Sequence, residues 1–150
     1  MKIWIDADGA PQGMREIVYR ASARLNLPVV LVANRPQQTP RSRLISTVVV
    51  GHGMDVADDH IADNVAPGDI VVTNDVPLAA SVVERGAVAL QHRGEVIDQQ
   101  NARERLALRD LREEVRAMGA MVGGPPPYDA LARQRFANSL DRLLTVLTRR

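Results

Sequence analysis

Two carboxylates, Asp6 and Asp8, follow the first apolar run of the chain, Ile3 to Ile5. Such a run is typical of a strand that is buried on both faces of an open parallel sheet. Because side chains alternate along a strand, both carboxylates can point to the same side if the extended conformation continues through Asp8. Two acids so close repel each other unless a bound cation, a raised pKa or solvent compensates them. The pattern therefore predicts chemistry at this strand end.

A second polar strand end follows residues 69–73 (D-I-V-V-T), where Asn74 and Asp75 come directly after a predicted strand. The helix expected before it carries more acids in its first turns, including Asp58 and Asp59. If the two strands are neighbours, these side chains form an acidic crater at one edge of the sheet.

Apolar runs and helical periodicity alternate along the chain. Strands are expected at residues 3–5, 29–33, 46–50, 69–73 and 87–90, and helices at 11–25, 55–66, 77–85, 98–118 and from 129 onward. This alternation favours an α/β fold with three layers (α/β/α) and a mostly parallel five-stranded sheet, with further helices at the C-terminal end. In the expected strand order 3-2-1-4-5, the first and fourth strands are neighbours. Asp6 and Asp75 are then expected to face each other at the switch point where ligands bind.

The chain has no internal repeat or low-complexity linker, so its 150 residues are expected to form one domain. Residues 1–97 are the predicted α/β core, and residues 98–150 are a helical part packed on it. Asp55 and Asp98 are expected to cap the helices that follow them. An apolar seam on the fourth helix can close within the monomer or onto a second copy, which leaves a homodimer possible. The seam consists of Leu108, Leu111, Val115 and Met118.

Oxygen ligands at such a crater suit Mg²⁺ or Mn²⁺, which keep several waters and are completed by substrate phosphates. The implied chemistry is phosphodiester hydrolysis, with Asp6, Asp8 and Asp75 as the catalytic acids. A cap or turn is the ordinary role of a single Asp, and it accounts for most of Asp55, Asp59, Asp63 and Asp69. It accounts less well for the three acids at the two strand ends.

The composition excludes several classes of protein. The chain has no cysteine, which removes disulfides, thiolate zinc sites and thiol nucleophiles. No apolar run approaches 18 residues and the amino terminus is a predicted strand, so we expect a cytoplasmic protein with no membrane partner. No glycine-rich phosphate loop is present, which argues against a nucleoside triphosphate site.

Positive charge is concentrated at the C-terminal end. The first hundred residues carry nine basic and twelve acidic residues, and the last fifty carry ten and six. Lys2 is the only lysine, so the other cations are guanidinium groups suited to phosphate. The arginines of the fourth helix are candidates for holding a nucleic-acid backbone, although aromatic residues for base stacking are scarce, at 3%.

Several motifs together resemble the YaiI/YqxD family of small bacterial proteins. They are W-I-D-A-D-G-A-P, V-V-L-V-A-N, V-V-V-G-H-G-M-D-V-A-D-D-H-I, G-D-I-V-V-T-N-D-V-P-L-A, G-G-P-P-P-Y and R-Q-R-F-A-N-S-L-D, and they span nearly the whole chain. That family is similar in turn to PIN and NYN nuclease domains, in which an acid after the first strand and a T-x-D-x-x-L-A segment after the fourth contribute to a metal site. The chain departs from the family at Gly9 and Ala10, where Ala-Cys is usual, so no role of that cysteine is transferred.

The resemblance implies a Mg²⁺- or Mn²⁺-dependent ribonuclease-like enzyme with a PIN-like fold. By position, it makes Asp6 and Asp75 the first metal ligands, followed by Asp8 and Asp58. The residues expected to contact an RNA substrate are Asn34, Thr73, Asn74 and Arg109.

Two alternatives remain open. D-A-D-G also resembles the first motif of haloacid-dehalogenase-like phosphatases, with Asp6 as nucleophile and Asp8 as acid/base. The chain lacks the later Lys or Arg followed by an acidic pair that those enzymes require, so this alternative ranks below the nuclease. The second is a binding protein that keeps the fold and uses the crater for a nucleotide, a nucleic acid or an ion without catalysis.

Overall fold

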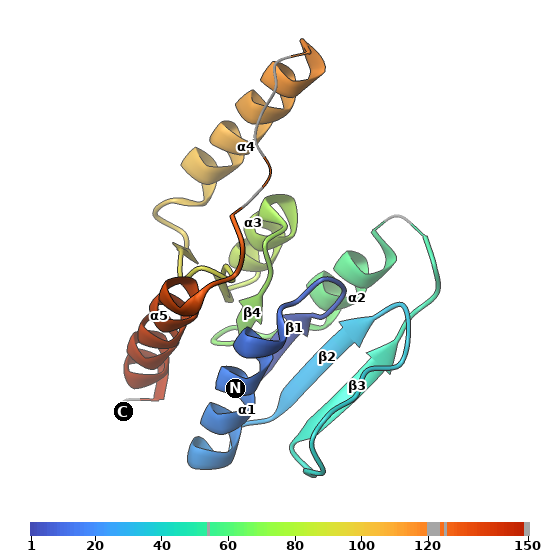
Figure 1. The fold of residues 1–150 in the computed structure, drawn as a ribbon, viewed down its shortest axis with the longest axis vertical. Coiled ribbons are helices and arrows are strands. Elements are labelled where there is room, and N and C mark those ends of the chain that lie inside the picture. Colours follow the sequence, from blue (N-terminus) through green and yellow to red (C-terminus); the bar gives the residue numbers. More distant parts are fainter. Residues whose placement is uncertain (54, 120–123, 125, 149–150) are drawn as a thin grey trace.

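The computed structural model, which describes residues 1–53, 55–119, 124 and 126–148, contains one six-stranded sheet with helices on both faces (Figure 1). The strands are β1 (Ile3–Asp6), β2 (Val29–Ala33), β3 (Ile45–Val49), β4 (Ile70–Val72), β5 (Val88–Leu90) and β6 (Val96–Ile97). The helices are α1 (Gln12–Leu25), α2 (Val56–Asn64), α3 (Val76–Glu84), α4 (Ala102–Ala117) and α5 (Ala130–Thr148). None of the described helices is long and apolar enough to span a membrane.

The strand order is β3-β2-β1-β4-β5-β6, so the predicted order of the first five strands is confirmed. These five strands are parallel, whereas β6 pairs antiparallel with β5. The prediction of five strands missed β6 because Val96 and Ile97 are too short a run to show an alternating pattern. The tight β5–β6 connection turns at Gly94, which has a φ of +94°.

Two apolar cores lie on opposite faces of the sheet. Ile3 and Ile5 of β1 point to the face covered by α1 and α5, where Phe136 is fully buried. Trp4 points to the other face, which packs on α2 and α3. Since alternate residues of a strand share a face, Asp6 continues the Trp4 side and points toward the helices that carry Asp58 and Asp75.

Two predicted helix caps are wrong. Asp55 precedes α2 but has a left-handed backbone, with a φ of 66°, and its side chain caps no N–H group. Asp98 instead accepts the N–H groups of Gln100 and Asn101, which forms a turn that delays α4 until Ala102. Side chains that bond their own backbone two or three residues later compete with helix formation in this way.

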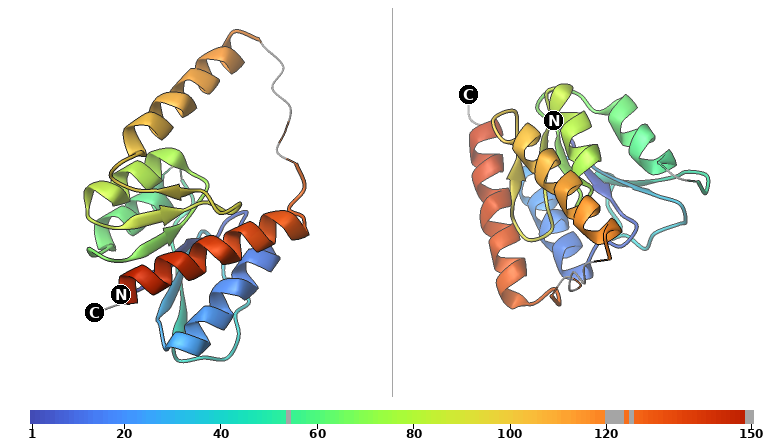
Figure 2. Two further views of the ribbon diagram at one scale, coloured as in Figure 1. Left: turned by 90° about the vertical axis from the view of Figure 1, so that its left-hand side faces the viewer. Right: turned by 90° about the horizontal axis from the view of Figure 1, so that it is seen from above.

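Helix α4 extends away from the sheet after it has passed α3 (Figures 1 and 2). It has no buried residue, and its apolar seam is exposed: Leu108 by 42%, Leu111 by 55%, Val115 by 39% and Met118 by 83%. Helix α5, in contrast, lies along α1 and contributes Phe136, Leu140 and Leu144 to the core (Figure 2).

Candidate active site

Thr73 connects the ends of β1 and β4. It is fully buried, and its hydroxyl donates a hydrogen bond to Oδ2 of Asp6 at 2.9 Å. The same hydroxyl accepts the backbone N–H of Asp75 at 3.0 Å. The parallel pairing of β1 with β4, with Ile5 opposite Val72, creates this arrangement because it aligns the residues that follow both strands. The two acidic strand ends predicted from the sequence therefore meet.

Asp75 is held in place by the helix that it begins. Its Oδ1 accepts the N–H of Leu78 at 2.9 Å and caps α3. This bond uses one carboxylate oxygen and fixes the orientation of the other.

Asp58, in the first turn of α2, lies close enough to Asp75 and Asp6 for their charges to act on it. Burial, followed by the interactions with Asp75, Asp6 and Asp55, raises the pKa of Asp58 to about 7. Burial also raises the pKa of Asp6, with Asp75 and Asp8 contributing, while the hydrogen bond from Thr73 opposes the shift. The negative charge at this site is therefore poorly compensated by the protein itself.

Asp8 and Asn34 meet at the edge of this cluster. Oδ2 of Asp8 accepts the backbone N–H of Asn34 at 3.0 Å, which directs the carboxylate toward the end of β2. Asp8 is exposed and lines a hollow with Arg15 and Arg35, apart from the Asp58–Asp75 contact. Asn34 contacts Asp8 through its backbone N–H, and the sequence pattern did not indicate this contact.

The donor set is oxygen-rich but loosely arranged. Among the residues that the structure describes, no three His, Asp or Glu side chains are close enough to form a ready metal-binding group. Mg²⁺ does not require such a group, because it is commonly held by one or two carboxylates, several waters and substrate phosphates. Asp6, Asp58 and Asp75 therefore fit a hydrated Mg²⁺ or Mn²⁺ better than a cation enclosed by protein ligands.

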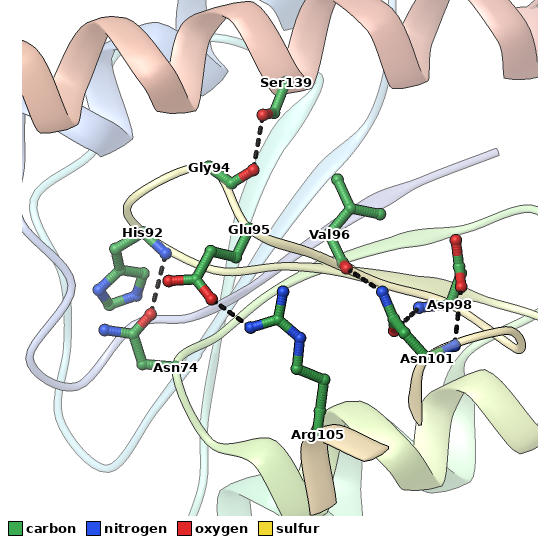
Figure 3. A network of polar contacts seen from close by, with 9 residues as sticks. All are labelled: Asn74, His92, Gly94, Glu95, Val96, Asp98, Asn101, Arg105 and Ser139. Carbon is green, nitrogen blue, oxygen red and sulfur yellow. Dashed lines mark hydrogen bonds and ion pairs between the residues drawn. The ribbon is translucent and has the colours of Figure 1, made fainter. Parts of the chain in front are cut away.

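Asn74 and Arg109 line a groove of about 310 Å³ between the β5–β6 connection and α4. Oδ1 of Asn74 accepts the backbone N–H of His92 at 2.9 Å (Figure 3). On the opposite wall, Arg105 of α4 pairs with Glu95 (Figure 3). The groove thus begins one residue before Asp75.

Sequence reasoning missed two residues that shape the site. His92, in the β5–β6 connection, is only 9% exposed, and its Nε2 has no hydrogen-bond partner among the described residues. Arg15 binds the carbonyl oxygens of Ala7 at 2.6 Å and Ala10 at 3.2 Å, so it holds the loop that carries Asp8. Neither residue belongs to a recognisable motif, since their roles arise from hydrogen bonds between loops and side chains that no spacing in the sequence indicates.

Comparisons with known proteins identify relatives of the whole chain. A family model described as "Uncharacterized BCR, YaiI/YqxD family" matches residues 4–146. A UPF0178 protein of Geobacter metallireducens is 54% identical over 149 residues, which is 99% of this chain and 96% of the relative. A UPF0178 protein of Geobacter sulfurreducens is 52% identical, and the alignment covers 100% of this chain and 100% of the relative. A UPF0178 protein of Myxococcus xanthus is 48% identical, over 99% of this chain and 97% of the relative. No solved structure matches the chain significantly. The chain therefore belongs to the YaiI/YqxD family, as its motifs predict.

Proposed function

We propose that the protein is a divalent-metal-dependent nuclease that hydrolyses phosphodiester bonds, with RNA as its substrate. The observation that carries the proposal is that the buried Thr73 joins Asp6 to the start of Asp75, with Asp58 of α2 near enough for the charges of both to act on it. Burying acids near one another costs free energy unless a cation compensates them, and the pKa values of Asp6 and Asp58, raised first by burial and then by neighbouring acids, reflect that cost. The resemblance to PIN and NYN nuclease domains supports RNA as the substrate.

Asp6, Asp58 and Asp75 would hold a Mg²⁺ or Mn²⁺ ion. When bound, the ion activates a water, orients the scissile phosphate and neutralises the leaving oxygen. Thr73 fixes the rotamer of Asp6, and the cap of α3 fixes that of Asp75. Asp58 would bind the ion in its deprotonated form, so its raised pKa makes metal binding weaker at lower pH.

Asp8 has a separate role in this proposal. Its carboxylate is bound by the Asn34 N–H at the rim, and its charge adds to the negative potential at Asp6. Asp8 therefore influences the ion through its field, and its loss is expected to impair activity less than the loss of Asp6 or Asp75.

Cleavage of a labelled single-stranded RNA in the presence of Mn²⁺ tests the proposal. Asp6→Asn and Asp75→Asn are each expected to reduce the rate by at least ~100-fold, beyond the ~10–100-fold typical of losing an outer-shell partner. Asp63→Asn is the matched control, because Asp63 is an exposed acid of α2 outside the cluster. Cleavage that survives both site substitutions would come from a contaminant or another site, and the proposal would fail.

A non-catalytic binding protein is the second candidate function. It is favoured by the lack of a ready group of three metal ligands among the described residues. This candidate predicts that single-stranded RNA binds but is not cleaved with either Mg²⁺ or Mn²⁺, and that Asp6→Asn leaves binding unchanged.

A further inference from the structure

We propose that the groove between the β5–β6 connection and α4 binds the phosphate backbone of a single nucleic-acid strand and leads it to Asp75. This inference rests on the proposed function and names the part of the chain that selects its substrate. The groove has a volume of about 310 Å³ and is lined by five arginines and two glutamates, in addition to four uncharged residues.

Four of the arginines form a row along α4. Arg105, Arg109, Arg112 and Arg116 follow one another at intervals of four, three and four residues, and all four line the groove. At 100° per residue this spacing places them on one face of the helix, within about 60° of arc and over about 16 Å of its length. A row of that length matches a chain of successive phosphates better than the single phosphate of a mononucleotide.

The fifth arginine, Arg93, comes from the facing wall, where its guanidinium donates to the carbonyl oxygens of Pro126 and Pro127. Cationic side chains thus border the groove on two sides. Backbone carbonyls orient Arg93 without neutralising it, so its charge remains available to an anion.

The acids in the groove compensate this charge only in part. Glu95 pairs with Arg105, and Glu113 pairs with Arg116 at 3.4 Å. Arg109 pairs with its neighbour Asp110 at 3.3 Å, with both side chains about half exposed. Exposed pairs of this kind contribute little stability, so a phosphate can displace the carboxylates at small cost. Within the described residues Arg112 forms no ion pair.

The β4–α3 loop joins the groove to the acidic site. Asn74 and Val76 line the groove, and Asp75 lies between them in the chain. Because the His92 N–H holds the oxygen of Asn74, the amide NH₂ of Asn74 is oriented as a donor (Figure 3). A strand along the arginine row therefore reaches the carboxylates through Asn74.

The lining also predicts the mode of recognition. Of the described residues that line the groove, none is aromatic, and Leu108 and Val76 are the apolar ones. Base stacking is therefore absent, and binding should depend on charge and be insensitive to sequence. The arginines form a single row, so we expect one strand to bind better than a duplex.

Fluorescence anisotropy with a 5′-labelled 12-nucleotide oligouridylate, in EDTA to prevent cleavage, tests the inference. The triple variant Arg109→Ala/Arg112→Ala/Arg116→Ala is expected to bind at least tenfold more weakly at 0.1 M salt. Its slope of log affinity against log salt should be about 2 units shallower, at ~0.7 unit per phosphate contact of a single strand. The triple variant is expected to fold like the wild type, because α4 has no buried residue.

The matched control is Arg20→Ala/Arg41→Ala/Arg103→Ala, which removes the same charge from exposed positions outside the groove. Arg103 lies on α4 itself but faces α3. The control should bind within about threefold of the wild type. Equal losses in both triple variants would overturn the inference, because they would reflect net charge alone.

Four further ligands distinguish the sources of phosphate. Single-stranded DNA of the same length should bind like RNA, because the contacts are to the backbone. Uridine monophosphate, inorganic phosphate and a 12-base-pair duplex should compete at least tenfold more weakly. Competition by the mononucleotide or the duplex at the level of the oligonucleotide would contradict the inference.

The proposed function and this inference can fail separately. Groove-dependent binding without any Mn²⁺-dependent cleavage would refute the nuclease and leave the strand-binding groove in place. Cleavage by the triple variant at the wild-type rate and KM would refute the groove and leave the nuclease in place.

Discussion

Thr73 has no exposed surface, yet its hydroxyl serves both strand ends of the acidic site. It donates to Asp6 and accepts from the N–H of Asp75, so one small side chain couples the positions of two acids. The hydrogen bond also opposes the rise in the pKa of Asp6 that burial causes.

Thr73→Val preserves the shape of this side chain and removes both hydrogen bonds. We expect it to raise the pKa of Asp6 further and to lower the free energy of unfolding by about 1–3 kcal/mol, since buried groups lose their partners. Urea denaturation and titration of Asp6 by carbon NMR measure the two effects. Thr73→Ser keeps the hydroxyl and should keep the pKa of Asp6, whereas an unchanged pKa in Thr73→Val would remove Thr73 from the site.

His92 contributes to the pH dependence of stability. Burial lowers the pKa of its imidazole to about 4, and the charges of Arg15 and Arg93 act in the same direction. The folded protein therefore prefers the neutral form, while the unfolded chain has the ordinary pKa of ~6.5. The stability from this preference is fully present above pH ~6.5 and is lost as the pH falls toward 4.

Comparison of the wild type with His92→Gln isolates this contribution. The raised pKa values of Asp6 and Asp58 act in the opposite sense in both proteins, so they cancel in the difference. Between pH 7 and pH 4 the wild type should lose more unfolding free energy than the variant. Parallel pH profiles of the two proteins would show that His92 titrates normally.

At the scale of the elements, the β5–β6 connection is the piece that builds one wall of the groove. Gly94 has a positive φ, and a Cβ at this position would lie 2.6 Å from the carbonyl oxygen of Arg135 in α5. Its own carbonyl oxygen accepts the hydroxyl of Ser139 at 2.6 Å (Figure 3). Close backbone contact therefore fixes the connection to α5.

Gly94→Ala should destabilise the protein by about 2 kcal/mol or more, because it adds a steric clash to the cost of a left-handed alanine. Gly68→Ala is the control: Gly68 has a φ of +88°, but no described atom lies within 4 Å of the position that an alanine methyl group would take there. Its cost should be limited to the ~1 kcal/mol of the backbone conformation. Equal thermal unfolding midpoints for the two variants would show that the connection does not depend on close contact with α5.

The elements also show what the sequence could predict. The first five strands follow from apolar runs and turn residues, which are local signals. Their order follows from the preference for right-handed crossovers, which leaves few arrangements. Strand β6 has two residues, and its pairing with β5 gives no local pattern. Asp98 looks like a cap, but Asn101 bonds the N–H of Asp98 and the carbonyl of Val96, which keeps this segment in a turn.

The candidate site also has some residues that the sequence could predict and some that it could not. The meeting of Asp6 with Asp75 follows from the alignment of parallel strand ends, and the proximity of Asp58 follows from the face of β1 that α2 covers. The alternation of side chains placed Asp8 beside Asp6, but the N–H of Asn34 draws Asp8 toward β2. Arg15 and His92 act through hydrogen bonds that involve loop backbone groups, and no spacing in the sequence indicates them.

At the scale of the whole molecule, the acidic site and the arginine row lie in different parts of the chain. The first hundred residues carry the acidic site and the last fifty carry the arginine row of α4, which leaves the body of the protein (Figure 1). A polyanion is attracted to α4 and repelled by the carboxylates until a divalent cation is bound. The cation is therefore expected both to hold the scissile phosphate and to reduce the repulsion between that phosphate and the carboxylates.

The most direct test is an anomalous difference map of a crystal soaked in Mn²⁺. The proposed metal site predicts one peak between Asp6, Asp58 and Asp75, and no peak there in crystals of Asp6→Asn/Asp75→Asn. A map of the wild type that has manganese only at other sites, or none at all, would contradict it.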